Sequence, residues 1–145
     1  MLLAGRDEDL LVVMRRASAQ PDTRVVGVVD ESGKLVGVLP IRRFAEAVVS
    51  RVAPEALLTD IADMEDVDRF GLTVQARVAG DLMMKPAVVR PETTVDDAFR
   101  LMHQRRLSGV YVVDAEGRPT GYLDLLELAL LYVDALESQP PQSSG

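Results

Sequence analysis

Two carboxylates stand three positions apart at the start of an apolar helical pattern near the C-terminus. Asp124 and Glu127 open the segment "DLLELALLYVDAL", residues 124–136. Two such acids could accept hydrogen bonds from the hydroxyl groups of a ligand. They could also serve only the helix, because Asp caps helix N-termini and Glu in a first turn favours the helix dipole. The residues alone leave both interpretations open.

Two adjacent arginines, Arg42 and Arg43, open an earlier helical segment, and they could contact a phosphate or simply face solvent. The single histidine, His103, lies off the apolar stripe of its segment, so we expect it to be exposed and inert. The chain has no cysteine, which excludes thiolate catalysis and zinc–sulfur sites. We find no metal-ligand spacing and no nucleophile–base arrangement, so the sequence predicts neither an enzyme nor a metal site.

Composition narrows the class of protein further. The 145 residues are 48% hydrophobic and carry a formal net charge of −7, which indicates a soluble folding chain with an aliphatic core. The acidic balance argues against binding to nucleic acid or to an anionic membrane surface. No segment reaches the roughly 20 apolar residues of a membrane span, and the first residues do not form a secretory signal. We therefore expect a cytoplasmic protein.

Hydrophobic periodicity predicts two similar sets of elements. The first set is a helix over 9–19, a hairpin of Val25–Val29 with Leu35–Leu39, and a helix over Ile41–Val52. The second set is a strand over Ala87–Arg90, a helix capped by Thr93 or Thr94, a hairpin of Val110–Val113 with Thr120–Leu123, and a helix over 124–136.

The two hairpins share a sequence motif, which indicates an internal repeat. Asp30, Gly33 and Gly37 of "VVDESGKLVG" recur 84 positions later in "VVDAEGRPTG". A half-chain of roughly 60 residues buries too little surface to be stable alone. Two small sheets packed face to face would each cover the other and would leave clefts around a pseudo-twofold axis.

These residues resemble a known family. "GDLMMKPAVVRPETTVDDAFRLMHQRR" followed by "LSGVYVVDAEGRPTGYLDLLEL" is similar to a cystathionine-beta-synthase (CBS) domain over residues 79–136. Residues 5–52 resemble a second CBS domain that lacks the usual first strand. The resemblance implies an α/β fold, a tandem CBS-domain pair of β-α-β-β-α repeats around a pseudo-twofold axis. The N-terminus, residues 72–78, or nothing could replace the missing strand.

The resemblance also implies a ligand site. Such pairs often bind adenosine-containing ligands between their repeats, and a Thr or Ser followed three residues later by Asp opens the last helix. Asp124 and Glu127 occupy these positions in the second repeat, so we expect a neutral or cationic ligand such as adenosine or S-adenosylmethionine more than AMP. The first repeat has Pro40 and Arg43 at these positions. Pro40 offers no hydrogen-bond donor, and the candidate phosphate contacts are Arg43 and its neighbour Arg42. The further ligand-binding candidates are Val88, Arg90, Ser108, Gly109, Val110 and Tyr111, of which Tyr111 could stack on a base or fill the cleft.

The predicted organisation is a first repeat over 1–53, an acidic helical connector over 54–78, a second repeat over 79–136 and a disordered tail over 137–145. The connector's acids form a solvated face rather than an ordered metal site. The last helix has almost no polar face, so we expect a homodimer through the helices Ile41–Val52 and Asp124–Leu136. The predicted function is a stand-alone regulatory module that senses an adenosyl ligand and acts on a partner protein. The alternative is a dimerisation or adaptor module without a small-molecule ligand.

Overall fold

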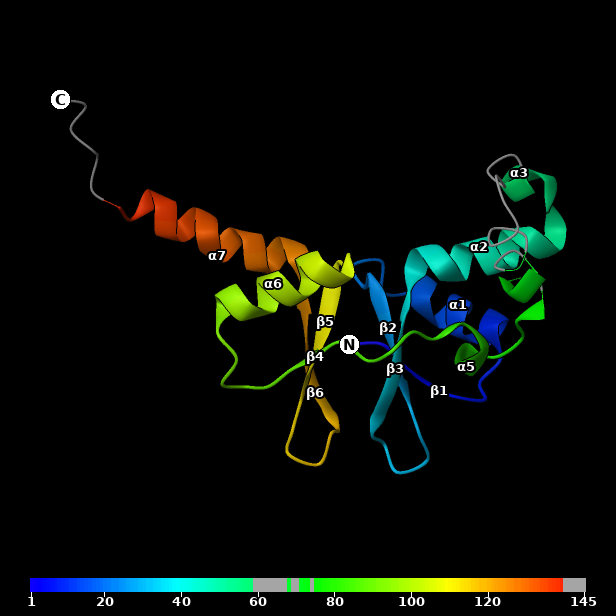
Figure 1. Ribbon diagram of the computed structural model, residues 1–145, viewed down its shortest axis with the longest axis horizontal. Helices are drawn as coiled ribbons and strands as arrows, with labels where there is room; N and C mark the ends of the chain where they lie inside the picture. The colour runs from blue at the N-terminus through cyan, green and yellow to red at the C-terminus, as the bar shows by residue number, and fades with distance from the viewer. Residues whose placement is uncertain (59–67, 69–70, 74, 140–145) are drawn as a thin grey trace.

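Two three-stranded sheets stand face to face at the centre of the molecule, with helices on their outer sides (Figure 1). The computed structural model describes residues 1–58, 68, 71–73 and 75–139. The strands are β1 (Leu3–Gly5), β2 (Val25–Val29), β3 (Leu35–Pro40), β4 (Val88–Val89), β5 (Gly109–Val113) and β6 (Pro119–Asp124). The helices are α1 (Leu10–Ser18), α2 (Ile41–Val52), α3 (Glu55–Leu58), α5 (Ala79–Leu82), α6 (Val95–Arg105) and α7 (Leu125–Glu137).

The two sheets have the same topology. In the first sheet β1 runs parallel to β2, which pairs antiparallel with β3, and the second sheet repeats this order with β4, β5 and β6. The predicted α/β fold with two repeats is therefore confirmed.

One detail of that prediction was wrong, because the first repeat does not lack its first strand. The N-terminal residues supply it: Leu3 pairs with Gly27 and Gly5 with Val29 in the parallel ladder. Only three residues form this strand, and they lack the Met–Pro opening that precedes its counterpart. Their short sequence "LAG" carries too little periodicity to be recognised without the neighbouring strand.

The repeated Asp and Gly residues build the two hairpin turns. Asp30 accepts backbone hydrogen bonds from Ser32 (2.9 Å) and Lys34 (3.0 Å) through Oδ1. Asp114 makes the same pair of contacts with the residues two and four positions ahead. Gly33 and Gly117 have φ of +84° and +82°, a backbone conformation that a side chain would strain. The motif thus specifies the turn and needs no ligand to explain it.

Side-chain caps fix where three of the helices begin. Asp9 caps α1, Thr94 caps α6 and Asp124 caps α7, each by accepting hydrogen bonds from backbone N–H groups of the first turn. The choice between Thr93 and Thr94 is settled in favour of Thr94. Helix α2 begins after Pro40, which provides no such bond.

The hydrophobic core has two parts, and each draws residues from both halves of the sequence. Val25 and Val38 of the first repeat belong to the cluster around Tyr111 and Met102. Conversely, α5 packs into the cluster of the first repeat through Ala79 and Leu82. The linker between the halves also forms a bridge, with Met84 N donating to Val38 O at 2.8 Å. The halves therefore fold as one unit.

Parts of two predicted segments lie outside the described residues. The acidic connector 54–78 includes 59–67, 69–70 and 74, and the tail includes 140–145. At the described ends of these segments, α3 follows Pro54 and α7 continues to Glu137.

Tyr111 joins the two repeats at the pseudo-twofold axis. Its side chain is fully buried, and its hydroxyl lies 2.7 Å from Leu2 O and 2.9 Å from Val25 O. The same oxygen accepts a hydrogen bond from Gly27 N at 2.9 Å. A residue of β5 thus satisfies backbone groups of the N-terminal segment and β2. Tyr111 fills the space between the sheets, so its ring is not accessible for stacking on the base of a ligand.

We predict that Tyr111→Phe destabilises the protein by about 2–3 kcal/mol, because buried backbone groups of the first repeat lose their partner. Denaturant unfolding of the whole chain measures this change. Tyr132→Phe is the matched control, since Tyr132 also donates a hydroxyl hydrogen bond, to Asp96, but at an exposed position. Equal effects of the two substitutions would contradict the role assigned to Tyr111.

Tyr111 also predicts how stability depends on alkaline pH. Burial raises the pKa of Tyr111 well above its ordinary value. A tyrosine whose pKa is higher in the folded than in the unfolded state contributes stability that is fully present below pH of about 10 and is lost as the pH rises further. We expect phenolate absorbance of Tyr111 to appear only as the circular dichroism signal is lost. Complete titration of all tyrosines near pH of about 10 in a folded protein would refute this.

Candidate functional site

A cleft of about 700 Å³ lies between the loop after α1 and the first turns of α7. We call it the α7 cleft. The first repeat contributes residues 19–24 and Met1, and the second repeat contributes β6 and α7. The residues that line it are Met1, Ala19, Gln20, Pro21, Asp22, Thr23, Arg24, Tyr122, Asp124, Leu126, Glu127 and Leu130. The site is therefore formed by both repeats, as the resemblance implied.

Asp124 lies at the inner wall of the α7 cleft, and one of its two carboxylate oxygens already accepts a hydrogen bond from the protein. Its Oδ1 accepts a hydrogen bond from Leu126 N at 2.7 Å and caps α7. Its Oδ2 lies 3.9 Å from Arg24 Nε. The Asp124 side chain is only 14% exposed. The N-terminal end of α7, where a helix commonly binds an anion, already holds a carboxylate of the protein itself.

Glu127 is one turn further along α7 and is exposed on the rim of the cleft. The structure thus brings Asp124 and Glu127 to the same cleft, with the inner acid serving the helix. Arg24 is the cationic side chain that lines this cleft, against the acids Asp22, Asp124 and Glu127.

Tyr122 covers the floor of the cleft. Its hydroxyl accepts a hydrogen bond from Arg24 N at 3.0 Å, and its ring lies 5.1 Å from that of Tyr111. Burial raises the pKa of Tyr122, and the neighbouring charge of Asp124 adds to the shift. Tyr122 stays a neutral hydroxyl at physiological pH, able to donate a hydrogen bond.

Of the predicted residues at the start of β5, Ser108 is exposed, whereas Gly109, Val110 and Tyr111 are buried. Gly109 pairs with Asp124 in the hairpin, and Ser108 O accepts a hydrogen bond from Leu125 N at 2.9 Å. Ser108 also lines a smaller recess of about 290 Å³ next to Asp124. In contrast, the side chains of Val110 and Tyr111 are fully buried. A Cβ added to Gly109 would lie 2.1 Å from the Tyr122 hydroxyl, so Tyr122 occupies the space above Gly109.

The other predicted site residues lie away from the α7 cleft. Val88 pairs with Tyr111 in the second sheet, and Arg90 donates a hydrogen bond to Asp114 O (2.8 Å) at the turn end of the hairpin. Arg42 and Arg43 are exposed on the first turn of α2, where Arg42 makes an ion pair of 3.7 Å with Glu46. The ligand-binding and phosphate roles of these four residues stay predictions.

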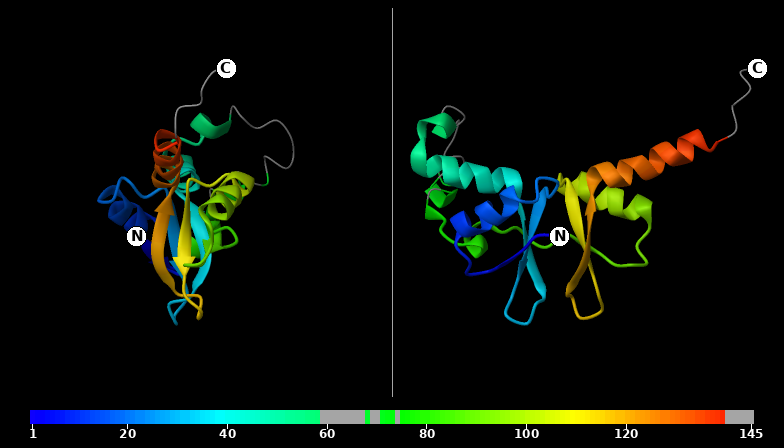
Figure 2. Two further views of the ribbon diagram at one scale, coloured as in Figure 1. Left: turned by 90° about the vertical axis from the view of Figure 1, so that its left-hand side faces the viewer. Right: turned by 180° about the vertical axis from the view of Figure 1, so that it is seen from behind.

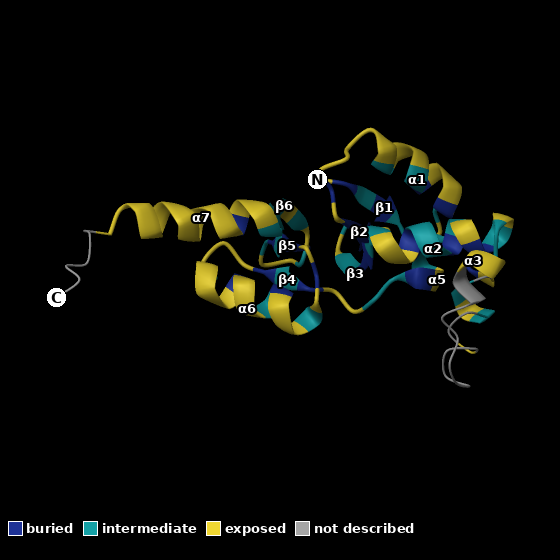
Figure 3. Cartoon of the chain, turned by 90° about the horizontal axis from the view of Figure 1, so that it is seen from above, coloured by how far each residue is buried: buried dark blue, intermediate teal, exposed yellow. Residues whose placement is uncertain are grey.

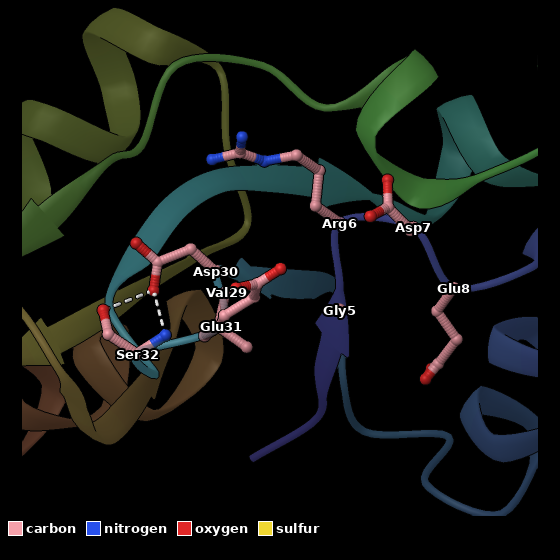
Figure 4. A pocket seen from close by; sticks show the side chains of 8 residues that line it. All are labelled: Gly5, Arg6, Asp7, Glu8, Val29, Asp30, Glu31 and Ser32. Carbon is pink, nitrogen blue, oxygen red and sulfur yellow. Dashed lines mark hydrogen bonds between the residues drawn. The ribbon is translucent and has the colours of Figure 1, made fainter.

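A second pocket, of about 580 Å³, lies between the end of β1 and the first hairpin (Figure 4). Its acids are Asp7, Glu8, Asp30 and Glu31. Asp30 Oδ1 is occupied by Ser32, as the dashed lines show, and Glu8 makes an ion pair with Arg16. In the part of the chain that the structure describes, no three acidic or histidine side chains are placed to hold a metal ion. Asp30 thus serves the hairpin turn and Glu8 a surface ion pair.

Sequence reasoning missed Arg24, Tyr122 and the loop 19–24. The internal repeat could have identified Arg24, because it corresponds to Ser108 at an offset of 84 residues. Around a pseudo-twofold axis, the hairpin start of one repeat meets the last helix of the other. Tyr122 was already inside the quoted motif, two residues before Asp124.

Comparisons with known proteins agree with this architecture. Residues 79–134 match the family model described as CBS domain. A CBS domain-containing protein of Dictyostelium discoideum is 28% identical over 137 residues, which cover 94% of this chain and 88% of that protein. No helix within the described residues has the length and apolar character needed to cross a membrane.

Solved structures show the same fold at low identity. A CBS domain-containing protein from Thermotoga maritima superimposes with a TM-score of 0.71 at 22% identity, covering 97% of this chain and 88% of that one. CBSX2 of Arabidopsis thaliana in complex with AMP has a TM-score of 0.67 at 21% identity (92% and 88% covered). The CBS domain pair of protein MJ0100, in complex with 5′-methylthioadenosine and S-adenosyl-L-methionine, has a TM-score of 0.66 at 18% identity (92% and 89% covered).

Proposed function

We propose that this protein is a regulatory module for an adenosyl ligand without phosphate. Residues 79–134 match the CBS domain model, and the fold is that of CBS domain-containing proteins, which supports the proposal. The ligand binds in the α7 cleft, and the module acts on a partner protein rather than on a substrate. Binding of AMP by one similar structure and of S-adenosyl-L-methionine by another supports an adenosine-containing ligand.

The position of Asp124 is the observation that supports a neutral or cationic ligand. Its carboxylate caps α7 and is mostly shielded from solvent. A phosphate group at the same helix end would lie within a few ångströms of this anion, at a repulsion of about 1 kcal/mol or more. Together with Asp124, the acids Asp22 and Glu127 outnumber Arg24, the one basic side chain that lines the cleft. The cleft therefore favours a neutral or cationic compound.

In this proposal Glu127 binds the hydroxyl groups of the ribose. It is exposed on the rim, so both its carboxylate oxygens are open to the two hydroxyl groups of a ribose. A carboxylate can accept two hydrogen bonds at once, and these are stronger than bonds between neutral groups. Tyr122, which lines the cleft beside Asp124, and Ser108, which lines the adjoining recess, would contact the remainder of the ligand.

A thermal-shift and calorimetric panel tests the proposal with adenosine, 5′-methylthioadenosine, S-adenosylmethionine, AMP and ATP. We expect the melting temperature to rise by about 5 °C with at least one of the first three at saturating concentration, and by less with AMP or ATP. Asp124→Thr keeps a cap for α7 but removes the charge, so this variant should gain affinity for AMP. Asp9→Thr is the control, because it changes the cap of α1 away from the cleft.

Tighter binding of ATP than of S-adenosylmethionine to the unmodified chain would refute the assigned charge preference. The absence of any shift with the five compounds would favour the alternative function, a dimerisation or adaptor module without a small ligand. The exposed apolar surface of α7 supports that alternative, because such a surface is typical of a protein interface. The regulatory proposal also includes a homodimer, so this surface alone does not distinguish the two functions.

The homodimer has its own test. Leu126, Leu130 and Leu136 on α7 are 63%, 51% and 68% exposed, which is unusual for leucines along one helix. We expect light scattering at micromolar concentration to give twice the mass of the chain. Leu130→Gln with Leu136→Gln should shift the mass toward that of a monomer, while Val95→Gln on α6 should not. A monomeric mass of the unmodified chain would contradict the homodimer.

A further inference from the structure

Two serines of the chain follow a pair of adjacent arginines. The sequence "RRAS" ends at Ser18, and the sequence "RRLS" ends at Ser108. No other serine of the chain has such a pair two and three positions before it. Basic residues at these positions are a charge pattern that protein kinases with an acidic substrate groove select. The chain therefore has two candidate phosphorylation sites, and the fold decides which of them a kinase can reach.

Ser18 lies at the accessible end of α1. It is the last residue of this helix, and both Ser18 and the residues 19–22 that follow it are exposed (Figure 3). Arg15 and Arg16 are exposed as well. Arg16 makes an ion pair with Glu8, but 44% of its side chain stays accessible to solvent. Because an ion pair on the surface is weak, it leaves Arg16 available to a kinase.

The last turn of α1 can open without disturbing the core. A kinase takes a serine from an extended segment, so this turn has to unwind. Ser18 Oγ donates one hydrogen bond to it, to Arg15 O at 2.6 Å. The buried residues of α1, Leu10 and Val13, belong to the first half of the helix. Helix ends open locally at little cost, since their last carbonyl groups lack partners within the helix.

The same arginine pattern before Ser108 is held in place by tertiary contacts. Arg105 Nη2 donates a hydrogen bond to Lys85 O at 2.6 Å, and Leu107 is only 5% exposed within the second core cluster. Ser108 O accepts a hydrogen bond from Leu125 N, and β5 begins at the next residue. A kinase could extend this segment only by detaching β5 from its sheet. The fold thus leaves Ser18 accessible and protects Ser108.

A phosphate on Ser18 would act on the α7 cleft, because the loop 19–24 begins directly after it and lines that cleft. Figure 2 shows this loop beside the start of α7. A phosphorylated Oγ has no hydrogen to donate to Arg15 O. The phosphate also adds about −1.5 to −2 charges at the negative end of the helix dipole. Arg15 and Arg16 neutralise part of this charge but do not restore the hydrogen bond, so we expect the turn to loosen.

We propose that Ser18 is a phosphorylation site for a serine kinase that selects two preceding arginines, and that its phosphorylation loosens the loop 19–24. In the reaction Ser18 Oγ attacks the γ-phosphorus of ATP, and the bond from that phosphorus to the bridging oxygen of ADP breaks. ADP leaves, and the hydroxyl proton passes to the base of the kinase. The proposal goes beyond the proposed function. It needs no ligand, and Ser18 lies outside α2 and α7, the helices of the homodimer.

Phosphorylation of the full chain in vitro tests the site. The chain is incubated with magnesium ATP and the catalytic subunit of cyclic-AMP-dependent protein kinase, which selects this arginine pattern. We expect mass spectrometry to find one phosphate per chain, at Ser18. Ser18→Ala should abolish the modification, and Ser108→Ala should leave it unchanged. Synthetic peptides of residues 12–22 and 102–112 are the controls, because they present both patterns without the fold, and both should be phosphorylated.

The outcomes separate the site from the effect of the fold. Phosphorylation of Ser108 in the full chain as fast as that of Ser18 overturns the protection assigned to the second site. No phosphate on the full chain, or none on the peptide 12–22, overturns the assignment of Ser18.

Substitution of the arginines gives a second readout. Arg15→Gln with Arg16→Gln should slow phosphorylation by about tenfold or more, because the kinase loses two charge-assisted contacts. Arg42→Gln with Arg43→Gln is the matched control, since it removes another adjacent pair, on α2, and changes the net charge equally. Equal slowing by the two double substitutions would show that net charge, and not the residues before Ser18, determines the rate.

Hydrogen exchange measures the effect on the wall of the cleft. Gln20 N donates a hydrogen bond to Ala17 O at 3.0 Å, which protects this amide in the unmodified chain. We expect phosphorylation to speed its exchange by about tenfold, while the amides of β5 keep their rates. Ser18→Ala loses the side-chain hydrogen bond without adding charge, so it should have a smaller effect. Unchanged exchange over 19–24 in the phosphorylated chain overturns the loosening and leaves the site standing.

Discussion

The hydroxyl of Tyr111 is the interaction on which the two-repeat architecture depends. It connects β5 to the N-terminal segment and to β2 in a fully buried position, where water cannot replace it. Because Val25 and Val38 pack around the same ring, the two sheets share one core at this point. The geometry of the α7 cleft follows from this contact, since the cleft lies where the two repeats meet.

The cleft and the exposed helix are connected through a single residue. Asp124 ends β6, caps α7 and forms the inner wall of the cleft. In the proposed regulatory module, a ligand that reorganises the pair between Asp124 and Arg24 would act directly at the start of the helix that carries the apolar surface. The proposed ligand would thus reach this surface without any movement of the core.

Sequence patterns predicted the elements well and the site only in part. The strong periodicity of the helices and the Asp–Gly turns identified both repeats, because these features depend on residues close in the chain. The sequence left open whether the N-terminus supplies the first strand, because the three residues Leu3–Gly5 carry no pattern and are fixed only by pairing with β2. Likewise, Arg24 and Tyr122 join Asp124 only through the packing of one repeat on the other.

By itself the sequence determined the repeated fold, the turn chemistry and the presence of two carboxylates at the start of the last helix. Residue types and local spacing are sufficient for these features. Tertiary structure decided what those residues are free to do. Tyr111 is buried as a link between the repeats, one oxygen of Asp124 caps a helix, and the apolar side chains of α7 are exposed. Such outcomes depend on which surfaces meet across the pseudo-twofold axis, and contacts over some 84 positions are not encoded in any local pattern.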